Sequence, residues 1–478
     1  MRYGLGVDLG TSSVAAAICR PGGTEMVILG DRSVTAPAVV HLREDGTIVT
    51  GAAANRRALS NPERIGRGLR RYLGDPTPVI LGGASHSVTD LMGHILRDVV
   101  RTVVDAEGGP PDDVVLTRPA SWNPTRYRLL DQVAAIAGLH RARTVVDPEA
   151  SAAHFAQTRR PRDGEIVAVY DLGGGTFDAA VLIKRPYGME LLGDPEGIER
   201  LGGIDFDETI LSYVDYRTDG ALSRLDLQDQ RTAGALARLR QDCALAKEAL
   251  TGDTETTVPV LLPDRHLDVR ITRAEFENML RAPVEATLGA LARALRSARV
   301  TPRDLAAVLL TGGCTRIPMV ARAVQAEFGV AVVRLHPDHA TALGAAALAA
   351  RSALAAAERP GPPAPWPTAP TFHPPRPEPG PPPPPTPRPA PAQEHQVPPW
   401  PPGPTAPEPS EKAPSGDGDW RSASIGRMLV IGVALLAAAV LVAVVTYFVI
   451  LRLRGDSAGT TPRSLAVAAV VAAPPRPW

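Results

Sequence analysis

The sequence predicts an α/β domain built from two related halves, followed by segments of very different composition. Two stretches share one plan, Asp8-Leu9-Gly10-Thr11-Ser12-Ser13 and Asp171-Leu172-Gly173-Gly174-Gly175-Thr176-Phe177-Asp178. Each follows an apolar run and precedes another, which is the pattern of a β-hairpin with a glycine-containing turn. Around the two hairpins, strand-like and helix-like stretches alternate through residues 1–352, as in α/β domains.

The two hairpins also predict a chemistry. Glycines in the turns let backbone N–H groups approach an anion closely. An aspartate at the end of the preceding strand is placed to hold a hydrated Mg²⁺ ion. Two such hairpins in two halves of one domain therefore predict a nucleoside triphosphate that is gripped from both sides.

The other elements follow from apolar periodicity and from breaks at glycine and proline. The expected strands include 114–117, 166–170, 179–183 and 307–310. The expected helices include 87–104, 126–137, 232–250, 272–299 with an interruption at Pro283, and 340–357.

The composition gives no support for nucleic-acid binding, for a cysteine metal site or for a disulfide framework. Lys and Arg total 51, as do Asp and Glu, so the formal net charge of +0 gives no indication of nucleic-acid binding. The three cysteines, Cys19, Cys243 and Cys314, lie far apart and have neither metal-ligand spacing nor an even disulfide framework. We expect a reducing compartment for the main domain.

The composition changes sharply after residue 352. Residues 353–426 hold roughly half of the chain's 49 prolines and show no apolar periodicity, which predicts a disordered, polyproline-biased linker. Residues 428–451 contain no charged side chain and are long enough, at ~1.5 Å per residue, to cross a bilayer as a helix. A buried core helix is the alternative, but no domain flanks this stretch. Residues 452–478 are expected to form a short disordered tail outside the cytoplasm.

The orientation of this single-pass protein is predicted from its N-terminus. Arginine and lysine are balanced on the two sides of residues 428–451, so the positive-inside rule does not decide. The sequence runs from Met1 directly into the first expected strand without a signal peptide. We therefore expect a plasma-membrane protein whose nucleotide-binding domain is cytoplasmic and whose C-terminus lies outside.

Over residues 1–352 these motifs resemble the nucleotide-binding domain of DnaK-type chaperones, the heat shock protein 70 family within the actin-like ATPase superfamily. The resemblance implies two duplicated lobes around a nucleotide cleft, with ATP and Mg²⁺ as cofactors. It implies that Asp8, Asp171 and Asp178 organise the hydrated Mg²⁺ and the attacking water, and that Thr176 lies near the γ-phosphate. The implied phosphate-loop residues are Gly10, Thr11, Ser12, Gly173, Gly174 and Gly175.

The same resemblance implies an adenosine side. Gly312 and Gly313 would form a turn close to the nucleotide, and Arg316 would stack on the adenine. Asp338 belongs to the motif of the closing helix. The helix that resembles the ribose-binding segment supplies two matching residues, Lys247 and Thr251, whereas the family's ribose-binding glutamate is replaced by Ala244.

Two catalytic positions depart from the family pattern. Arg70 stands where the family has a lysine that touches the γ-phosphate, and Asp147 stands where it has a glutamate that orients the catalytic water. A carboxylate drawn back by ~1.5 Å can cost roughly 100-fold in rate. Two other interpretations are open: Arg70 and Arg71 as solvated surface charges, and Asp147 as a helix N-cap before Pro148. Pro119-Ala120 matches an interdomain relay position of the family.

No stretch after residue 352 resembles the family's conserved linker or its peptide-binding domain. The first hypothesis is therefore a membrane-anchored ATP-binding protein that hydrolyses ATP slowly, or a nucleotide-dependent switch. It would act in chaperone-like or envelope-associated regulation through an unknown protein partner, possibly bound by the proline-rich linker. The alternatives are a degenerate scaffold that displays this linker and a small-molecule kinase of the same superfamily.

Overall fold

The computed structural model describes residues 2–30, 32–226, 229–263 and 265–357. The strands are β1 (Gly4–Leu9), β2 (Ser13–Arg20), β3 (Gly23–Met26), β4 (Thr35–Pro37), β5 (Val39–Leu42), β6 (Ile48–Thr50), β7 (Ile65–Arg67), β8 (Val79–Leu81), β9 (Ala84–His86), β10 (Asp113–Arg118), β11 (Arg143–Val146), β12 (Ile166–Leu172), β13 (Thr176–Arg185), β14 (Gly188–Glu199), β15 (Glu255–Leu262), β16 (Arg265–Thr272), β17 (Leu305–Thr311) and β18 (Val332–Arg334). The α-helices are α1 (Gly51–Asn55), α2 (Val88–Glu107), α3 (Pro124–Ile136), α4 (Asp147–Arg159), α5 (Gly203–Arg217), α6 (Gln230–Gly252), α7 (Arg273–Met279), α8 (Arg281–Ser297), α9 (Pro318–Phe328) and α10 (Ala340–Ala357). Four 3₁₀ turns complete the description: η1 (Pro62–Arg64), η2 (Leu69–Tyr72), η3 (Pro302–Asp304) and η4 (Gly313–Arg316).

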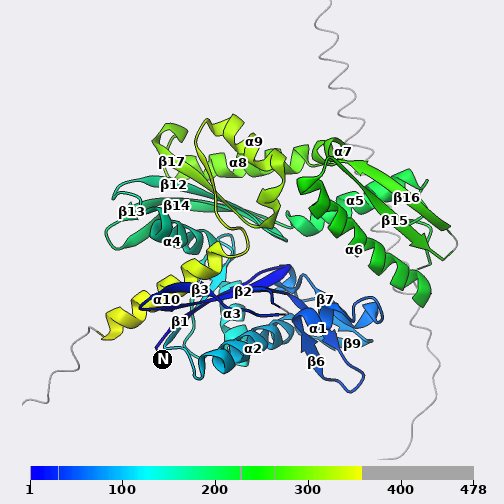
Figure 1. Cartoon of the computed structure of the whole chain (residues 1–478), viewed down its shortest axis with the longest axis horizontal. Helices are drawn as coiled ribbons and strands as arrows, with labels where there is room; N and C mark the ends of the chain where they lie inside the picture. The colour runs from blue at the N-terminus through cyan, green and yellow to red at the C-terminus, as the bar shows by residue number, and fades with distance from the viewer. Residues whose placement is uncertain (1, 31, 227–228, 264, 358–478) are drawn as a thin grey trace, which may run out of the picture. The chain divides into compact units, whose positions relative to one another are not determined.

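Two sheets with the same connectivity define two lobes. The first-lobe sheet has the order β11-β10-β1-β2-β3, and the second-lobe sheet has the order β14-β13-β12-β17-β18. In each, three consecutive antiparallel strands are extended by two parallel strands that arrive later in the chain. Figure 1 shows the first lobe in blue and cyan and the second in green. The duplication predicted from the two hairpins is thus present in the topology.

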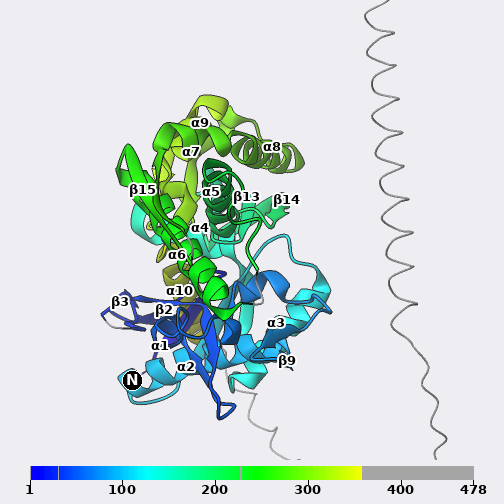
Figure 2. The same ribbon diagram turned by 90° about the vertical axis from the view of Figure 1, so that its right-hand side faces the viewer.

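Helices α4 and α10 lie between the two sheets. Helix α10 packs against β1, β2 and β10 of the first lobe, while α4 contacts β12, β13 and β14 of the second. The two helices also pack against each other, as Figure 2 shows from the side. They come very close because their facing residues are small. A Cβ added at Gly344 of α10 would lie 1.7 Å from the carbonyl oxygen of Ala150 of α4.

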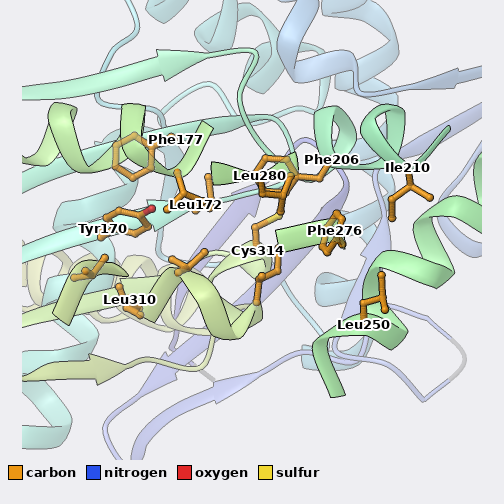
Figure 3. Close-up of a cluster of buried hydrophobic side chains, with 14 of the residues drawn as sticks. Tyr170, Leu172, Phe177, Phe206, Ile210, Leu250, Phe276, Leu280, Leu310 and Cys314 are labelled. Atoms are coloured by element: carbon orange, nitrogen blue, oxygen red, sulfur yellow. The ribbon is translucent and has the colours of Figure 1, made fainter. Parts of the chain in front are cut away.

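Each lobe has its own apolar core. The first-lobe core gathers aliphatic side chains from β1, β2 and α2 together with Trp122. The second-lobe core is larger and contains Tyr170, Phe177 and Phe206, and Figure 3 shows these rings in one cluster with Cys314. The phenol of Tyr170 is satisfied inside this core, because its Oη lies 2.6 Å from the hydroxyl oxygen of Thr287. Few aromatic residues are needed, since alanines fill the seam between the sheets.

The expected helices and strands are present, and most boundaries shift by a few residues. Strand β13 begins at Thr176 rather than at residue 179, and helix α6 runs from Gln230 to Gly252. The expected interruption at Pro283 was misplaced, because the chain breaks at Leu280 and Pro283 lies in the first turn of α8. Proline is tolerated there, since the first-turn N–H groups have no partner within the helix. Helix α10 continues to Ala357, so residue 352 lies inside it.

The expected proline-rich linker lies outside the described residues from residue 358 onward, as do the expected membrane span at 428–451 and the tail at 452–478. Within the described part of the chain, none of the helices combines the length and the apolar character needed to cross a bilayer. The expected span therefore stays a prediction.

Candidate functional site

The turns of the two hairpins meet at one cleft. Asp8 is the penultimate residue of β1, the leading strand of the first hairpin, and Asp171 pairs with Asp178 across the second hairpin. The turns touch: a Cβ added at Gly174 would lie 2.2 Å from the Ser12 hydroxyl, and one at Gly175 would lie 2.5 Å from the Thr11 side chain. This approach requires glycine in the second turn, which explains part of the Gly-Gly-Gly string.

The cleft encloses a cavity of about 80 Å³, which is smaller than the roughly 300–1,000 Å³ that is usual for ligand sites. The sequence-predicted residues that line it are Asp8, Gly10, Thr11, Ser12, Arg70, Asp147, Asp171, Gly173, Gly174, Thr176, Gly312, Gly313 and Asp338. The structure thus brings residues from both hairpins and from four other segments to one place. The sequence reasoning did not assign Ser13, Ala15, Pro337 and Thr341, which also line the cleft.

Four aspartates at or just beneath the cleft give it a negative electrostatic character: Asp8, Asp147, Asp171 and Asp178. Burial, reinforced by the neighbouring Asp147 carboxylate, raises the pKa of Asp8 to about 6 and that of Asp178 to about 6. Burial and the other three carboxylates raise the pKa of Asp171 well above its ordinary value. So many acids in a small volume cannot all ionise without a compensating cation. The cleft is therefore suited to a divalent ion.

Arg70 is the compensating cation present in the protein itself. Its side chain is 7% exposed, and its Nη2 donates to Oδ2 of Asp147 at 2.8 Å. Its Nη1 lies 3.9 Å from Oδ1 of Asp8. The interpretation of Arg70 and Arg71 as solvated surface charges is wrong, because Arg71 is also mostly covered and donates to Asp205 of α5 at 2.8 Å.

Asp147 is the first residue of α4 and not its N-cap. The N-cap position belongs to Val146, and no side chain caps the helix there. The Asp147 carboxylate instead turns to Arg70 through Oδ2, while its Oδ1 is buried without a hydrogen-bond partner. The N-cap interpretation is therefore wrong. A buried carboxylate oxygen without a partner is costly and fits a bound group or an ordered water.

Asp178 is buried beneath the cleft and does not line it. Its Oδ1 accepts hydrogen bonds from the backbone N–H groups of Ala120 at 3.0 Å and Ser121 at 3.3 Å. These two residues follow β10 in the first lobe, whereas Asp178 belongs to β13 in the second. This acid therefore connects the lobes directly, in addition to contributing negative charge.

The residues expected on the adenosine side are only partly gathered at the cleft. Gly312 has φ of 81°, which favours glycine, and its missing side chain allows the backbone of Leu172 to pass close by. Arg316 does not line the cleft, but it donates to Asp338, which does, at 2.5 Å. Its guanidinium is thereby held beside the cleft.

Lys247, Thr251 and Gly175 also do not line the cleft. Lys247 is held by an ion pair of 2.7 Å with Asp207 of α5 and by the carbonyl oxygen of Gly203 at 3.2 Å. Thr251 lies one turn further along α6 and donates to the backbone oxygen of Lys247 at 3.4 Å. Gly175 is covered by Thr11. Of the two α6 residues expected at the ribose, Lys247 is thus directed toward α5, and Thr251 bonds to its own helix.

Across the described ranges, no group of three His, Cys, Asp or Glu side chains is close enough to coordinate a metal ion directly. The aspartates can approach an ion through its water shell, as Mg²⁺ commonly allows. Asp8, Asp171 and the oxygen of Asp147 that has no partner supply acceptors for such waters. The donor set therefore fits a hydrated divalent ion.

The comparisons with known proteins agree with this geometry. The family model described as "Hsp70 protein" matches residues 78–354, more than half of the chain. "Chaperone protein DnaK" of Thermotoga petrophila is 33% identical over 355 residues, which cover 72% of this chain and 59% of the relative. The protein of the same name from Thermosipho africanus is 31% identical over 362 residues, covering 73% and 59%. The chain thus spans about three-fifths of the length of these relatives, and it belongs to the Hsp70 family.

Proposed function

We propose that the chain binds ATP with Mg²⁺ in the cleft between its lobes and acts as a nucleotide-dependent switch with slow hydrolysis. The observation that carries this proposal is the meeting of two glycine-containing hairpin turns above a cluster of aspartates. Backbone N–H groups in such turns suit phosphate oxygens, and acids at the ends of strands suit a hydrated cation. Membership of the Hsp70 family supports the same ligand.

Each part of the cleft takes one part of the ligand. The turns at Gly10–Ser12 and Gly173–Gly174 would hold the phosphates, and Asp8 and Asp171 would hold the waters of the cation. When bound, Mg²⁺ neutralises phosphate charge and favours its transfer to water. The Gly312-Gly313 turn and Asp338 would border the nucleoside.

Slow hydrolysis follows from the pair Arg70–Asp147. The ion pair of 2.8 Å with the buried Arg70 holds the Asp147 carboxylate in one orientation, and its other oxygen, Oδ1, is left to accept a hydrogen bond from an attacking water. Aspartate is one methylene shorter than the glutamate it replaces, so this oxygen is drawn back by ~1.5 Å. A displacement of that size can cost roughly 100-fold in rate. The pair favours retention of ATP over its cleavage.

We extend the proposal to the rest of the chain on sequence grounds. The uncharged stretch 428–451 would anchor the protein in the plasma membrane with the nucleotide-binding domain in the cytoplasm. The output would then reach a protein partner through the lobe surface or the proline-rich linker. Membrane fractionation combined with protease protection of intact cells tests the anchor, because a cytoplasmic domain resists external protease.

Calorimetry with ATP and ADP, together with turnover measured on the purified full-length chain, tests the central proposal. We expect ATP to bind at micromolar concentration in the presence of Mg²⁺ and to turn over slowly. Asp171→Asn should abolish binding or weaken it strongly, whereas Asp163→Asn, at an exposed ion pair with Lys184, should not. No binding at millimolar ATP would contradict the proposal and favour the scaffold alternative.

A further inference from the structure

The segment Pro119–Asn123 follows β10 and contacts the second lobe at Asp178, and the proposed function leaves one of its side chains unexplained. Ala120 and Ser121 hold Asp178 through their backbone N–H groups. The next residue, Trp122, is 3% exposed and belongs to the first-lobe core. Its own N–H donates to the carbonyl of Pro119 at 3.4 Å. The following residue, Asn123, caps α3, so the backbone is fixed on both sides of the tryptophan.

The indole of Trp122 lies against Arg70. The guanidinium carbon of Arg70 is 5.5 Å from the centroid of the ring, within the range of a cation–π interaction. The same guanidinium also reaches Asp147 at 2.8 Å and Asp8 at 3.9 Å. Arg70 is therefore held by a rigid aromatic ring together with two carboxylates. Ordering a flexible arginine side chain costs rotamer entropy, and these contacts offset that cost.

Arg70 matters because of its charge. Among the described residues that line the cleft, it is the one with a positively charged side chain. A triphosphate carries more negative charge than a diphosphate at the same site. The position of this guanidinium should therefore affect ATP more strongly than ADP.

We propose that Trp122 is the positioning residue for Arg70 and, through it, sets the preference of the cleft for a nucleoside triphosphate over a diphosphate. Trp122 does not contact the ligand in this account. It fixes the guanidinium in one place, so that the cation meets the terminal phosphate without reorganisation. The inference rests on the proposed nucleotide binding and adds the residue that controls its selectivity.

The same ring also lies near a contact between the lobes. The guanidinium carbon of Arg126 is 6.0 Å from the Trp122 centroid, and Arg126 forms an ion pair of 2.5 Å with Glu199 of the second lobe. Loss of the indole thus removes support from Arg126 as well. The test must separate this effect from the effect on Arg70.

The test is a double-substitution cycle on the full-length chain, with dissociation constants measured for ATP and for ADP in the presence of Mg²⁺. We expect Trp122→Leu to lower the ratio of ATP to ADP affinity by about 2- to 30-fold, the range of a buried cation–π contact. ADP affinity should change by less than about 2-fold. In an Arg70→Gln background, Trp122→Leu should leave the ratio unchanged, because the cation that it positions is absent.

Two further variants control for a general loss of packing in the first lobe. Tyr127→Leu removes a ring that lies 3.7 Å from the Arg118 guanidinium in the same lobe but does not line the cleft, and it should leave the ratio unchanged. Trp122→Phe keeps an aromatic ring and should give a smaller decrease than Trp122→Leu. If the leucine variant does not fold, the cycle with Arg70→Gln is completed with phenylalanine.

The possible results separate a failure of the role proposed for Trp122 from a failure of the proposed nucleotide binding. A wild-type chain that binds neither nucleotide overturns the proposed function itself. A chain that binds both, with an unchanged ratio in the Trp122 variants, overturns the role of Trp122. The role is also overturned if the ratio falls equally with and without Arg70, because the ring would then act through Arg126 or through general packing.

Discussion

The contact between α4 and α10 gives the sharpest stability prediction, for the substitution Gly344→Ala. A Cβ at this position would lie 1.7 Å from the Ala150 carbonyl oxygen and 2.6 Å from its carbon. Real Cβ atoms are almost never closer than 3.0 Å to such atoms. The obstacle is the backbone of another helix, which no rotamer change can move away. The helices must separate by about 1.3 Å, the difference between these two distances.

The energetic cost follows from the packing of this seam. Overpacking a core costs about 1–3 kcal/mol, and more when the backbone must shift. Here the shift also loosens the alanine contacts along α10, so we estimate a cost of roughly 3–5 kcal/mol. Alanine recovers about 0.5–1 kcal/mol through its higher helix propensity. The net loss of roughly 2–4 kcal/mol should lower the unfolding temperature of a domain of this size by roughly 3–5 °C.

Thermal unfolding of the full-length chain measures this loss. The matched control is Gly289→Ala in α8, where an added Cβ would meet nothing closer than 3.8 Å. That variant should gain stability, again by about 0.5–1 kcal/mol. Equal stability of the two variants would refute the reasoning, since the same substitution should have opposite signs at the two sites. Gly344→Ala should also weaken nucleotide binding, because Thr341 of α10 lines the cleft.

Three further predictions concern the cleft. The double variant Arg70→Lys with Asp147→Glu restores the family's residues, so we expect steady-state ATP turnover to rise by roughly 10- to 100-fold; an unchanged rate would show that the ion pair does not limit hydrolysis. The pKa of Asp8 and that of Asp178 are raised from 3.8 to about 6, so the folded domain favours the protonated form of both acids. Without divalent cations, their contribution to the free energy of unfolding is fully present below pH 3.8 and is lost as the pH rises through about 6. The stabilisation by Mg²⁺ in thermal unfolding should therefore be larger at pH 7.5 than at pH 5, and Asp8→Asn should reduce that difference. Lys247→Ala removes the partner of a mostly buried acid and should lower the unfolding temperature, but if Lys247 stays directed toward α5 it should change ADP affinity by less than about 3-fold.

Much of the fold could be predicted because its signals are local. Each of the two hairpins is identified by an apolar run, an aspartate, glycines and a second apolar run, and its register is fixed by the turn. The boundaries were less predictable. Leu280 ends α7 through its backbone geometry, whereas Pro283, the obvious breaker, is accommodated in the first turn of the next helix.

The residues of the site also differ in how well the sequence predicts them. Glycine turns and strand-end aspartates were found because each carries its chemistry within a few residues. The partners of long side chains could not be found, because they come from distant segments. The pair Arg70–Asp147 joins residues 77 positions apart, and the pair Lys247–Asp207 joins two helices. A sequence pattern identifies the charge but not the carboxylate that it meets.

The ion pairs between the lobes imply a particular response to ionic strength. Arg71 with Asp205, Arg126 with Glu199 and, at 4.0 Å, Arg200 with Asp75 connect the lobes along one edge, and in each pair at least one side chain is more than a quarter exposed. Dissolved salt screens such pairs within a Debye length of about 8 Å at physiological concentration.

The seam of small residues between α4 and α10 carries no charge and is insensitive to screening. Rising salt should thus speed the release of a bound nucleotide while the unfolding temperature of the ligand-free domain changes little. Stopped-flow release of a fluorescent ADP analogue between 50 mM and 500 mM KCl would show this separation. A release rate that does not change with salt would mean that these ion pairs do not control how the lobes separate.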